Sequence, residues 1–308
     1  MDTKKLRQKI LDLAIHGKLV PQDPNDEPAS VLLERIRSEK ERLIKEGKIK
    51  RSRKTTKTSD AACDEQEVPF EVPNGWVWCR LGEVNDIARG GSPRPIKDYL
   101  TNSKNGVNWI KIGDTTKDGK YINSVKEKIR VEGVTKSRMV HKGDFLLTNS
   151  MSFGRPYILN VDGCIHDGWL VISPIGKVYS SDFLYYLLSS SFALNQFTQV
   201  ASGGVVSNLN SDKVADTMFP IAPLAEQQRI VEEIECWFKL IDIIEQGKAD
   251  LQTTIKQAKN KILDLAIHGK LVPQDPNDEP ASELLKRINP KAEITCDNGH
   301  YPKLPKGW

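Results

Sequence analysis

The feature that most constrains this sequence is a segment that occurs twice without a single change. Lys9–Ser30 reads KILDLAIHGKLVPQDPNDEPAS, and Lys261–Ser282 has the same 22 residues. The similarity continues more loosely, as VLLERI at 31–36 and ELLKRI at 283–288. Solenoid repeats follow one another at periods of about 20–50 residues, far less than this offset of 252. We therefore expect two equivalent structural places on either side of an inserted globular domain, and an assembly built symmetrically on them.

A second, shorter repetition has the pattern Pro-x-Gly-Trp. It occurs at 73–76, where it opens the central globular stretch, and again at 305–308, at the last residues of the sequence. The second occurrence opens nothing further here. This arrangement indicates a longer two-domain plan, of which the sequence holds the first half and the start of the second.

The stretch before the second copy has the spacing of a coiled coil. Apolar residues recur in steps of three and four over five heptads, which favours a helical seam. Pro223 suits the first turn and Gly269 a left-handed C-cap, so a helix is predicted from Leu224 to His268. It would measure about 67 Å, too long for a small core to bury without a helical partner. The predicted seam, for dimer or partner docking, comprises Ile230, Ile234, Trp237, Ile241, Ile244, Leu251, Ile255, Ile262 and Leu265, with Leu6, Ile10 and Leu13 in the first copy.

Lys248, beside Gly247, fills the one polar position of this seam. A polar seam residue can set the register or the orientation of helical partners. A weak point of the helix at the surface is an equal alternative, and both stay open at this point.

The net charge is only +4, but basic residues gather in one segment. Lys45–Lys57 (KEGKIKRSRKTTK) holds seven basic residues and one acidic residue. Such a cluster suits contacts with phosphates, which are electrostatic and independent of sequence. A solvated linker has the same composition, and the segment taken alone slightly favours the linker.

Several classes of protein are excluded by composition. The five cysteines lie far apart and form no CxxC pair, so neither a disulfide framework nor a zinc site is indicated. No run approaches the roughly 18 apolar residues of a membrane span, and the first residues lack the apolar core of a signal peptide. We expect a cytoplasmic protein without a membrane partner.

The central stretch combines short strands with turns. Runs such as WVWCRLGEV, DFLLTNS and WLVISPI are bounded by Gly, Asn, Asp and Pro, as strands are. One helix is predicted over Ser181–Gln199, because Phe183, Leu184, Leu187, Leu188 and Leu194 share a face. The predicted fold class is therefore α+β, with one mixed α/β domain and long coiled-coil-forming helices.

The expected parts follow from these patterns. They are a helical region with a basic tail at 1–58, a linker at 59–66, the mixed domain at 67–222, the heptad helix at 223–269, the second repeat copy with its helix at 270–300, and the start of a second domain at 301–308.

No catalytic constellation stands out in the mixed domain. The sequence has no Asp/Asn-Pro-Pro-aromatic motif of amino-methyltransferases, no Walker P-loop, no HExxH and no GxSxG. Three polar loops instead suit DNA, because arginine can pair two-pronged with guanine and asparagine with adenine. The candidate DNA-binding residues are Arg89, Ser92 and Arg94 in the first loop, Thr148, Asn149, Ser150, Ser152 and Arg155 in the second, and Ser207 and Asn208 in the third.

With these features the chain resembles the specificity subunit of Type I restriction–modification enzymes over almost its whole length. The resemblance rests on FPIAPLAEQQRIV at 219–231, on the Pro-x-Gly-Trp opening and on the LDLAIHGKLVPQ repeat. HDGWLVISP at 166–174 and WIKIGD at 109–114 are similar to strands of that family's target recognition domains. Family members usually carry two such domains, so this sequence is similar to a half-length form.

The resemblance implies that the domain reads one half of a split sequence in double-stranded DNA. The helices would set the distance between the halves and dock methyltransferase subunits, which bind S-adenosylmethionine. A separate motor–nuclease subunit would use ATP and Mg²⁺, while this chain would bind no cofactor or metal and catalyse nothing. Two copies would pair through antiparallel long helices and the repeats, giving a homodimer that reads a split palindrome.

Three alternatives remain. The chain could be an inactive, truncated fragment of a two-domain subunit. It could be a self-contained DNA-modifying enzyme, which the missing motifs disfavour. It could be a coiled-coil adaptor without a DNA role, against which the Arg- and Asn-bearing loops and the basic segment count.

Overall fold

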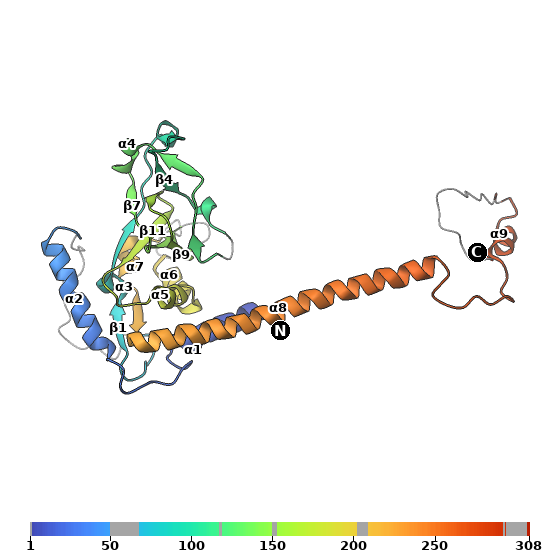
Figure 1. Cartoon of the computed structure of the whole chain (residues 1–308), viewed down its shortest axis with the longest axis horizontal. Helices are drawn as coiled ribbons and strands as arrows, with labels where there is room; N and C mark the ends of the chain where they lie inside the picture. The colour runs from blue at the N-terminus through green and yellow to red at the C-terminus, as the bar shows by residue number, and fades with distance from the viewer. Residues whose placement is uncertain are drawn as a thin grey trace. The chain divides into compact units, whose positions relative to one another are not determined.

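The computed structural model describes residues 2–49, 68–116, 119–149, 153–201, 209–291, 293 and 307–308. The chain divides into two compact units, Met1–Lys239 and Leu240–Trp308. Figure 1 shows sheets and helices mixed in the first unit, and the long helix α8 (Leu224–Ile267) that runs from the first unit into the second. The predicted α+β class with a long helix is confirmed.

A two-stranded sheet closes the mixed domain at its base. β1 (Val77–Arg80) pairs antiparallel with β12 (Met218–Ile221), so the strand that opens the domain lies against the strand that ends it. α8 begins three residues after β12, so this pairing fixes where the long helix starts.

Two five-stranded mixed sheets carry the loops of interest. One has the order β2-β11-β8-β9-β5 and the other β3-β6-β4-β10-β7. The first comprises β2 (Asn85–Arg89), β11 (Trp169–Pro174), β8 (Phe145–Thr148), β9 (Pro156–Leu159) and β5 (Tyr121–Ile122). The second comprises β3 (Leu100–Thr101), β6 (Glu127–Ile129), β4 (Val107–Ile110), β10 (Gly163–Ile165) and β7 (Arg138–Val140).

One apolar core joins the two sheets. Its buried side chains come from strands of both, among them Ile110 and Ile165 from one sheet and Leu146 and Trp169 from the other. All four residues of β8 are buried, as expected for a strand covered on both faces. This shared core holds the short β10–β11 connection close to the ends of β2 and β8.

The remaining elements are helical. They are α1 (Thr3–Ile15), α2 (Ala29–Lys45), α3 (Leu81–Val84), α4 (Val131–Val134), α5 (Ser181–Leu188), α6 (Ser191–Ala201), α7 (Ser211–Ala215) and α9 (Ala281–Ile288), with 3-10 turns at Ile96–Asp98 and Ile112–Asp114. Within the described residues, no helix has both the length and the apolar character needed to cross a membrane.

The predicted single helix over Ser181–Gln199 is wrong, because the structure has two helices there. Ser190 separates α5 from α6 and its buried hydroxyl serves both. The hydroxyl donates to the carbonyl of Leu187, at 2.6 Å, and accepts from the backbone N–H of Ala193, at 3.1 Å. A serine that caps a new helix in this way competes with continuation of the old one.

The strand predicted from WVWCRLGEV extends only to Arg80. Leu81–Val84 forms a helical turn, and the carboxylate of Glu83 accepts from the backbone N–H of Arg80, at 3.1 Å. Leu81 and Val84 are both fully buried. Apolar residues three positions apart point to one side in a helical turn, so this turn buries both.

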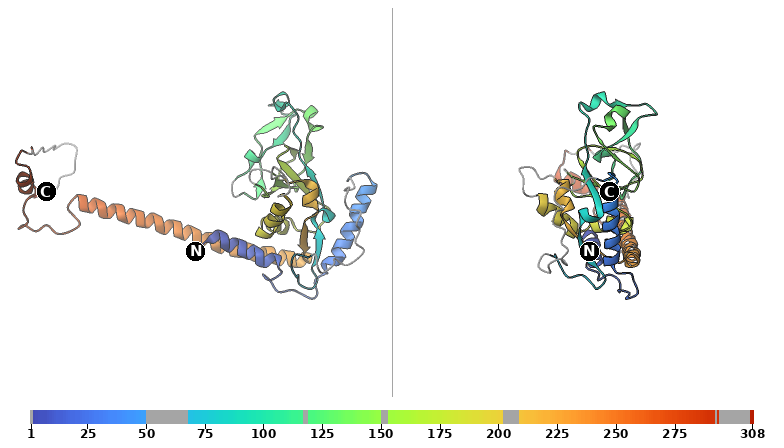
Figure 2. Two further views of the ribbon diagram at one scale, coloured as in Figure 1. Left: turned by 180° about the vertical axis from the view of Figure 1, so that it is seen from behind. Right: turned by 90° about the vertical axis from the view of Figure 1, so that its left-hand side faces the viewer.

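The first repeat copy docks on the start of α8. Figures 1 and 2 show α1 lying along the part of α8 that belongs to the first unit. The Arg7 guanidinium lies 4.8 Å from the ring centroid of Phe238, and Gln22 donates to Glu226 at 3.1 Å. Low numbers on one segment thus meet high numbers on the other, so α1 runs antiparallel to α8.

The long helix matches its prediction closely, since it spans Leu224–Ile267 against the predicted Leu224–His268. Gly269 has a φ of 64°, the left-handed value expected of a C-cap glycine. Gly17 has the same role after α1, with a φ of 63°. A Cβ at Gly17 would lie 2.3 Å from Cγ of Pro73, so the close approach also requires glycine.

Candidate nucleic-acid interface

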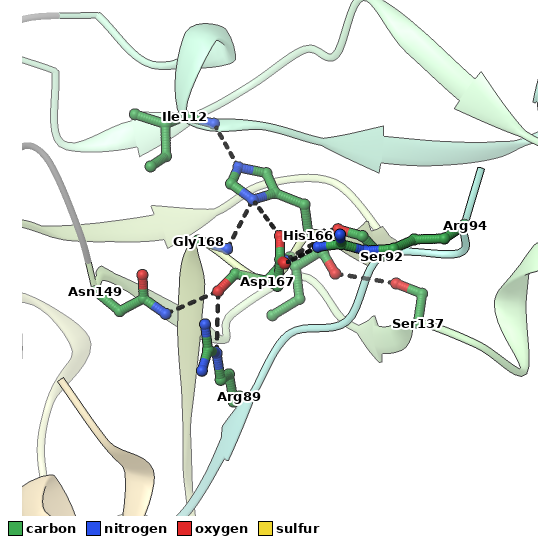
Figure 3. Close-up of polar contacts among 10 residues, drawn as sticks. Arg89, Ser92, Arg94, Ile112, Ser137, Asn149, His166, Asp167 and Gly168 are labelled. Atoms are coloured by element: carbon green, nitrogen blue, oxygen red, sulfur yellow. Dashed lines mark hydrogen bonds and ion pairs between the residues drawn. The ribbon is translucent and has the colours of Figure 1, made fainter. Parts of the chain in front are cut away.

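Two of the three predicted loops meet at Asp167, in the β10–β11 connection (Figure 3). From the first loop, Ser92 Oγ donates to the Asp167 carboxylate at 2.9 Å and Arg94 Nη2 at 3.1 Å. Arg89 Nε donates to the Asp167 carbonyl oxygen at 3.1 Å. From the second loop, Asn149 Nδ2 donates to the same carbonyl oxygen at 2.8 Å. We call these five residues the Asp167 cluster.

The first loop can approach the β10–β11 connection closely because Gly90 lies at the contact. Gly90 follows β2, and its N–H donates to the carbonyl of Trp169 at 2.9 Å. A Cβ at Gly90 would lie 2.1 Å from the carbonyl oxygen of His166. Any other residue would therefore push the first loop away from the β10–β11 connection.

His166 supports Asp167 from behind. Its ring lies against Trp109 and Trp169, with centroids 6.3 and 6.2 Å away. Burial lowers the pKa of His166 below its ordinary value, more than the carboxylate of Asp167 raises it. The backbone N–H of Gly168 points to Nδ1 at 2.7 Å and that of Ile112 to Nε2 at 3.2 Å. A neutral imidazole has one acceptor nitrogen, so it accepts one of these bonds at a time.

Asp167 is held ionised by its donors. Partial burial raises the pKa of this carboxyl, but the hydrogen bonds from Ser92 and Arg94 outweigh it, and the pKa lies below its ordinary value. The carboxylate thus offers a fixed negative charge to the guanidinium of Arg94. Because that side chain is 81% exposed, the guanidinium is oriented by the protein while most of it faces outward.

The two arginines of the first loop are the exposed members of the cluster. Arg89 and Arg94 are both exposed, whereas Ser92 is half-buried. A guanidinium has five N–H donors, and each of these arginines gives one to Asp167 in the contacts described above. The arrangement can therefore present oriented cationic donors to an anionic or acceptor-rich partner.

The described part of the second loop contains two buried residues and one half-buried arginine. Thr148 and Asn149 are buried; the hydroxyl of Thr148 accepts from the Arg155 N–H, at 2.9 Å. Both therefore position the loop in this structure, and base contact by them stays a prediction. Arg155 is half-buried and its guanidinium lies 5.5 Å from the ring centroid of Tyr157.

Leu209, the residue that follows the third loop, is bound to the second loop. Its N–H donates to the carbonyl of Asn149 at 3.3 Å. Four predicted site residues lie outside the described residues: Ser150 and Ser152 of the second loop, and Ser207 and Asn208 of the third. The part of the basic segment that follows Ile49 lies outside them too.

His166 and Asp167 were not among the predicted site residues. Their signal in the sequence is weak, because His-Asp-Gly before a strand has the composition of an ordinary turn. Only the folded structure shows that two distant loops are tied to this turn. Among the described residues, no three His, Cys, Asp or Glu side chains gather in a way that would hold a metal ion.

The predicted helical seam is divided by burial. Ile230, Ile234 and Ile241 are buried, while the seam side chains that follow are largely exposed. On α8, the exposed or half-buried members are Trp237, Ile244, Leu251, Ile255, Ile262 and Leu265. On α1, Leu6 and Leu13 are half-buried and Ile10 is buried.

The two repeat copies fold alike but are not equally covered. Ala29 N–H donates to the Gly75 carbonyl at 2.8 Å, and Ala281 N–H to the Gly307 carbonyl at the same distance. Yet Ile36 is 5% exposed, and its counterpart Ile288 is 73% exposed. The same local structure thus has a buried apolar face in the first unit and an exposed one in the second.

The Pro-x-Gly-Trp tryptophans show the same contrast. Trp76 Nε1 donates to the buried carboxylate of Glu226 at 2.9 Å, and Gln22 donates to that carboxylate too. In the second copy, Trp308 Nε1 donates to Gln274 at 3.0 Å, and Gln274 is the counterpart of Gln22. Among the described residues, a carboxylate that accepts from both the tryptophan and the glutamine is present only at the first copy.

Comparison with known proteins places these features in one family. The family described as "Type I restriction modification DNA specificity domain" matches residues 73–253, which is more than half of the chain. The matched range begins at the first Pro-x-Gly-Trp motif and ends within α8. It therefore includes all three predicted loops and the Asp167 cluster.

Two curated relatives from Escherichia coli are similar along almost the whole chain. The EcoAI specificity subunit is 30% identical over 99% of this chain and 61% of its own length. The EcoEI specificity subunit is 31% identical over 99% of this chain and 60% of its own length. The chain thus spans about three-fifths of the length of these relatives.

A solved structure of the type I R-M system supports the fold. It aligns with a TM-score of 0.53 at 21% identity, covering 79% of this chain and 58% of that one. At this identity the similarity concerns the arrangement of the elements alone.

Proposed function

The chain belongs to the Type I restriction modification DNA specificity domain family, and on that premise we propose that it is a DNA-recognition subunit that reads one half of a split sequence in double-stranded DNA. The observation that carries the proposal is the Asp167 cluster. It gathers two predicted loops and the edge of the third around one turn and orients two exposed arginines.

Recognition by this cluster follows from the chemistry of arginine. A guanidinium that is oriented before binding loses less conformational freedom when it pairs with the two acceptors of a guanine edge. Asp167 supplies that orientation for Arg94 through its carboxylate and for Arg89 through its carbonyl oxygen. Arg155, on the second loop, would add a phosphate or base contact beside them.

We propose that the helices connect this reading domain to the subunits that do the chemistry. The exposed seam of α8 and the exposed apolar face of the second repeat copy support docking of methyltransferase subunits. Those partners would bind S-adenosylmethionine, and a motor–nuclease partner would use ATP and Mg²⁺. This chain would bind none of these and catalyse nothing, and the complex would work in the cytoplasm.

We further propose that two copies form a homodimer that reads a palindromic split site. A two-fold assembly requires self-complementary surfaces, and the verbatim repeat offers the same surface at two places in each chain. The competing proposal is a truncated, inactive part of a two-domain subunit, which the three-fifths coverage of the relatives also supports.

Methylome mapping tests these proposals together. Cells carrying this chain with its cognate methyltransferase subunit should show adenine methylation at one split motif whose two halves are inverted copies. An asymmetric motif would sink the homodimer, and the absence of any motif would favour the truncated fragment. Arg94→Ala should abolish methylation if the Asp167 cluster reads the DNA sequence. Lys97→Ala, which changes an exposed lysine of the same loop region, should leave methylation intact.

A second candidate, a coiled-coil adaptor without a DNA role, is favoured only by the exposed seam. Footprinting of the assembled complex separates the two functions, because an adaptor would protect no particular sequence.

A further inference from the structure

A segment outside the three predicted loops lies directly beside the Asp167 cluster. This segment, residues 136–138, runs from the α4–β7 connection into β7. Its Ser137 hydroxyl donates to the carbonyl oxygen of Ile165, at 2.9 Å (Figure 3). The N–H of Gly91, in the first loop, donates to the same oxygen at 3.2 Å. A Cβ at Gly91 would lie 3.1 Å from the carbonyl oxygen of Lys136, so the segment and the first loop are in close contact.

The ammonium group of Lys136 is oriented by an aromatic side chain. Its Nζ lies 4.9 Å from the ring centroid of Tyr99 and donates to the Tyr99 hydroxyl. Tyr99 is itself held in place, because its ring packs on the buried cluster that includes Trp109 and Ile129. Its carbonyl oxygen also accepts from the N–H of Arg130, at 2.8 Å. An ammonium group has three N–H donors, and Lys136 is exposed, so donors remain for a partner outside the chain.

The charges around this segment favour an anionic partner. Residues 130–138 hold three basic side chains and one acidic side chain. All four are exposed, the basic ones being Arg130, Lys136 and Arg138 and the acidic one Glu132. The carboxylate of Asp167, in the adjacent turn, already accepts from two donors of the first loop. The surface beside the cluster therefore carries an excess of positive charge.

The backbone of DNA is an anionic partner that suits this surface. Each strand carries one phosphate per about 3.4 Å of helix axis, so a protein group that reaches a base edge has phosphates close by. Lysine binds phosphate as a point charge, and a side chain oriented before binding loses less freedom on contact. We infer that Lys136, with Arg138 two positions later, contacts the DNA phosphates that flank the base edge read by Arg94. The inference rests on the DNA-reading function proposed above and adds to it a contact that is independent of base sequence.

The salt dependence of DNA binding tests this contact. The full chain in complex with its methyltransferase subunit is titrated with two duplexes, one carrying the motif found by methylome mapping and one with a single base of that motif changed. Lys136→Ala should weaken binding to both duplexes by the same factor and reduce the slope of log K against log salt by about 0.9. Between about 50 and 200 mM salt, the variant should therefore lose about 3.5-fold less affinity than the wild type. Lys142→Ala, which changes an exposed lysine beyond the other end of β7, is the matched control and should keep the wild-type slope.

Two further variants separate the charge of Lys136 from its orientation. Lys136→Arg keeps the charge and should keep the wild-type slope, and a slope as low as that of Lys136→Ala would overturn the phosphate contact. Tyr99→Phe keeps the ring and removes the hydroxyl that accepts from Lys136. It should weaken binding to both duplexes and leave the slope unchanged, because the charge remains but is less well oriented. Wild-type affinity in Tyr99→Phe would refute the positioning role of the hydroxyl.

The outcomes distinguish this contact from the reading function. If Lys136→Ala keeps the slope of the wild type, Lys136 contacts no phosphate and the inference fails. If Lys136→Ala instead reduces the difference in affinity between the two duplexes, Lys136 reads a base and the inference also fails. If the wild type binds both duplexes equally, the proposed reading function fails, whereas a reduced slope in Lys136→Ala would still support the backbone contact.

Discussion

At the scale of single residues, the turn at Asp167 decides how the candidate DNA-binding side chains are held. Its carboxylate and its carbonyl oxygen together accept hydrogen bonds from four residues of two loops. The charge of the carboxylate matters for Arg94, whereas the carbonyl oxygen serves Arg89 and Asn149 whatever the side chain is. Substitutions at position 167 can therefore separate the orientation of Arg94 from the folding of the loops.

The first prediction concerns Asp167→Asn. The loops should stay folded, because the carbonyl contacts remain, but the charge that orients Arg94 is lost. DNA binding by the complex should weaken by about 1–3 kcal/mol, the range of one good arginine–base pair. Titration of a half-site duplex at fixed salt measures the change, with Asp162→Asn, an exposed aspartate of the preceding β9–β10 connection, as the matched control. Equal losses for the two variants would contradict the special place of Asp167.

The same carboxyl predicts a pH dependence of stability. Its folded pKa lies below the ordinary value of about 3.9. The ionised form is thus favoured by folding, and its contribution is present above the ordinary pKa and is lost as the pH falls through the folded pKa. Melting temperatures measured between about pH 5 and pH 2 should fall more steeply for the wild type than for Asp167→Asn. Parallel acid limbs would show that this carboxyl is not stabilised by folding.

At the scale of elements, buried polar side chains end and begin the helices. Ser190 separates α5 from α6, and Glu226 ties the start of α8 to both the first repeat copy and the first Pro-x-Gly-Trp motif. Glu226 is 1% exposed, so its two donors are satisfied by a carboxylate that water scarcely reaches. The two contacts of Glu226 connect segments 150 and 204 positions apart and fix the start of α8 against the domain.

Replacing Glu226 by alanine should destabilise the first unit. The change leaves the Trp76 N–H without its acceptor, whereas the Gln22 amide still donates to the Gly17 carbonyl, at 2.7 Å. An unmet buried donor costs about 1–3 kcal/mol. Urea unfolding followed by tryptophan fluorescence measures the loss. Gln274→Ala in the second copy is the matched control and should cost less, because the tryptophan it contacts is exposed. Equal costs would show that Glu226 does not fasten the first copy.

Ser190→Ala should also destabilise the domain, by about 1–2 kcal/mol, since it removes the cap of α6 and the donor to the Leu187 carbonyl. Ser191→Ala changes an exposed neighbour with no capping role and serves as the control. The two chemical denaturation midpoints, compared at equal slope, give the result. A midpoint for Ser190→Ala as high as that of the control would refute the capping role.

At the scale of the whole molecule, the two units differ in how they bury apolar surface. The first unit has a core drawn from two sheets, whereas the second exposes the seam of α8 and the apolar face of α9. A lone helix of this kind gains little stability from propensity, so its persistence in water depends on a partner. Stability of the second unit is therefore expected to depend on protein concentration.

Circular dichroism melts should show this dependence. Raising the concentration tenfold should stabilise the helical transition of the second unit by about 1.4 kcal/mol and leave that of the first unit unchanged. Leu251→Glu, which keeps helix propensity but puts a charge on the seam, should abolish the shift. A melt of the wild type that is independent of concentration would contradict pairing between copies.

Much of the organisation was determined by the sequence alone, because local signals specify local structure. The heptad spacing with Pro223 and Gly269 predicted α8 to within one residue at its end, and the verbatim repeat predicted two places with the same local fold. Turns and polar side chains are local features, so the sequence also predicted the loop that holds Arg89 and Arg94; contact of this loop with DNA stays a prediction. Such local patterns predict structure without any knowledge of contacts between distant residues.

The tertiary structure alone decided what those signals are used for. The apolar face of one repeat copy is buried and that of the other is exposed, although their residues are identical over Lys9–Ser30 and Lys261–Ser282. The difference comes from Glu226 and the start of α8, which lie close to the first copy only after folding. The loops likewise meet at Asp167 only after folding. Burial and hydrogen bonding between distant segments depend on how the strands are ordered in the sheets, which no local pattern in the sequence contains.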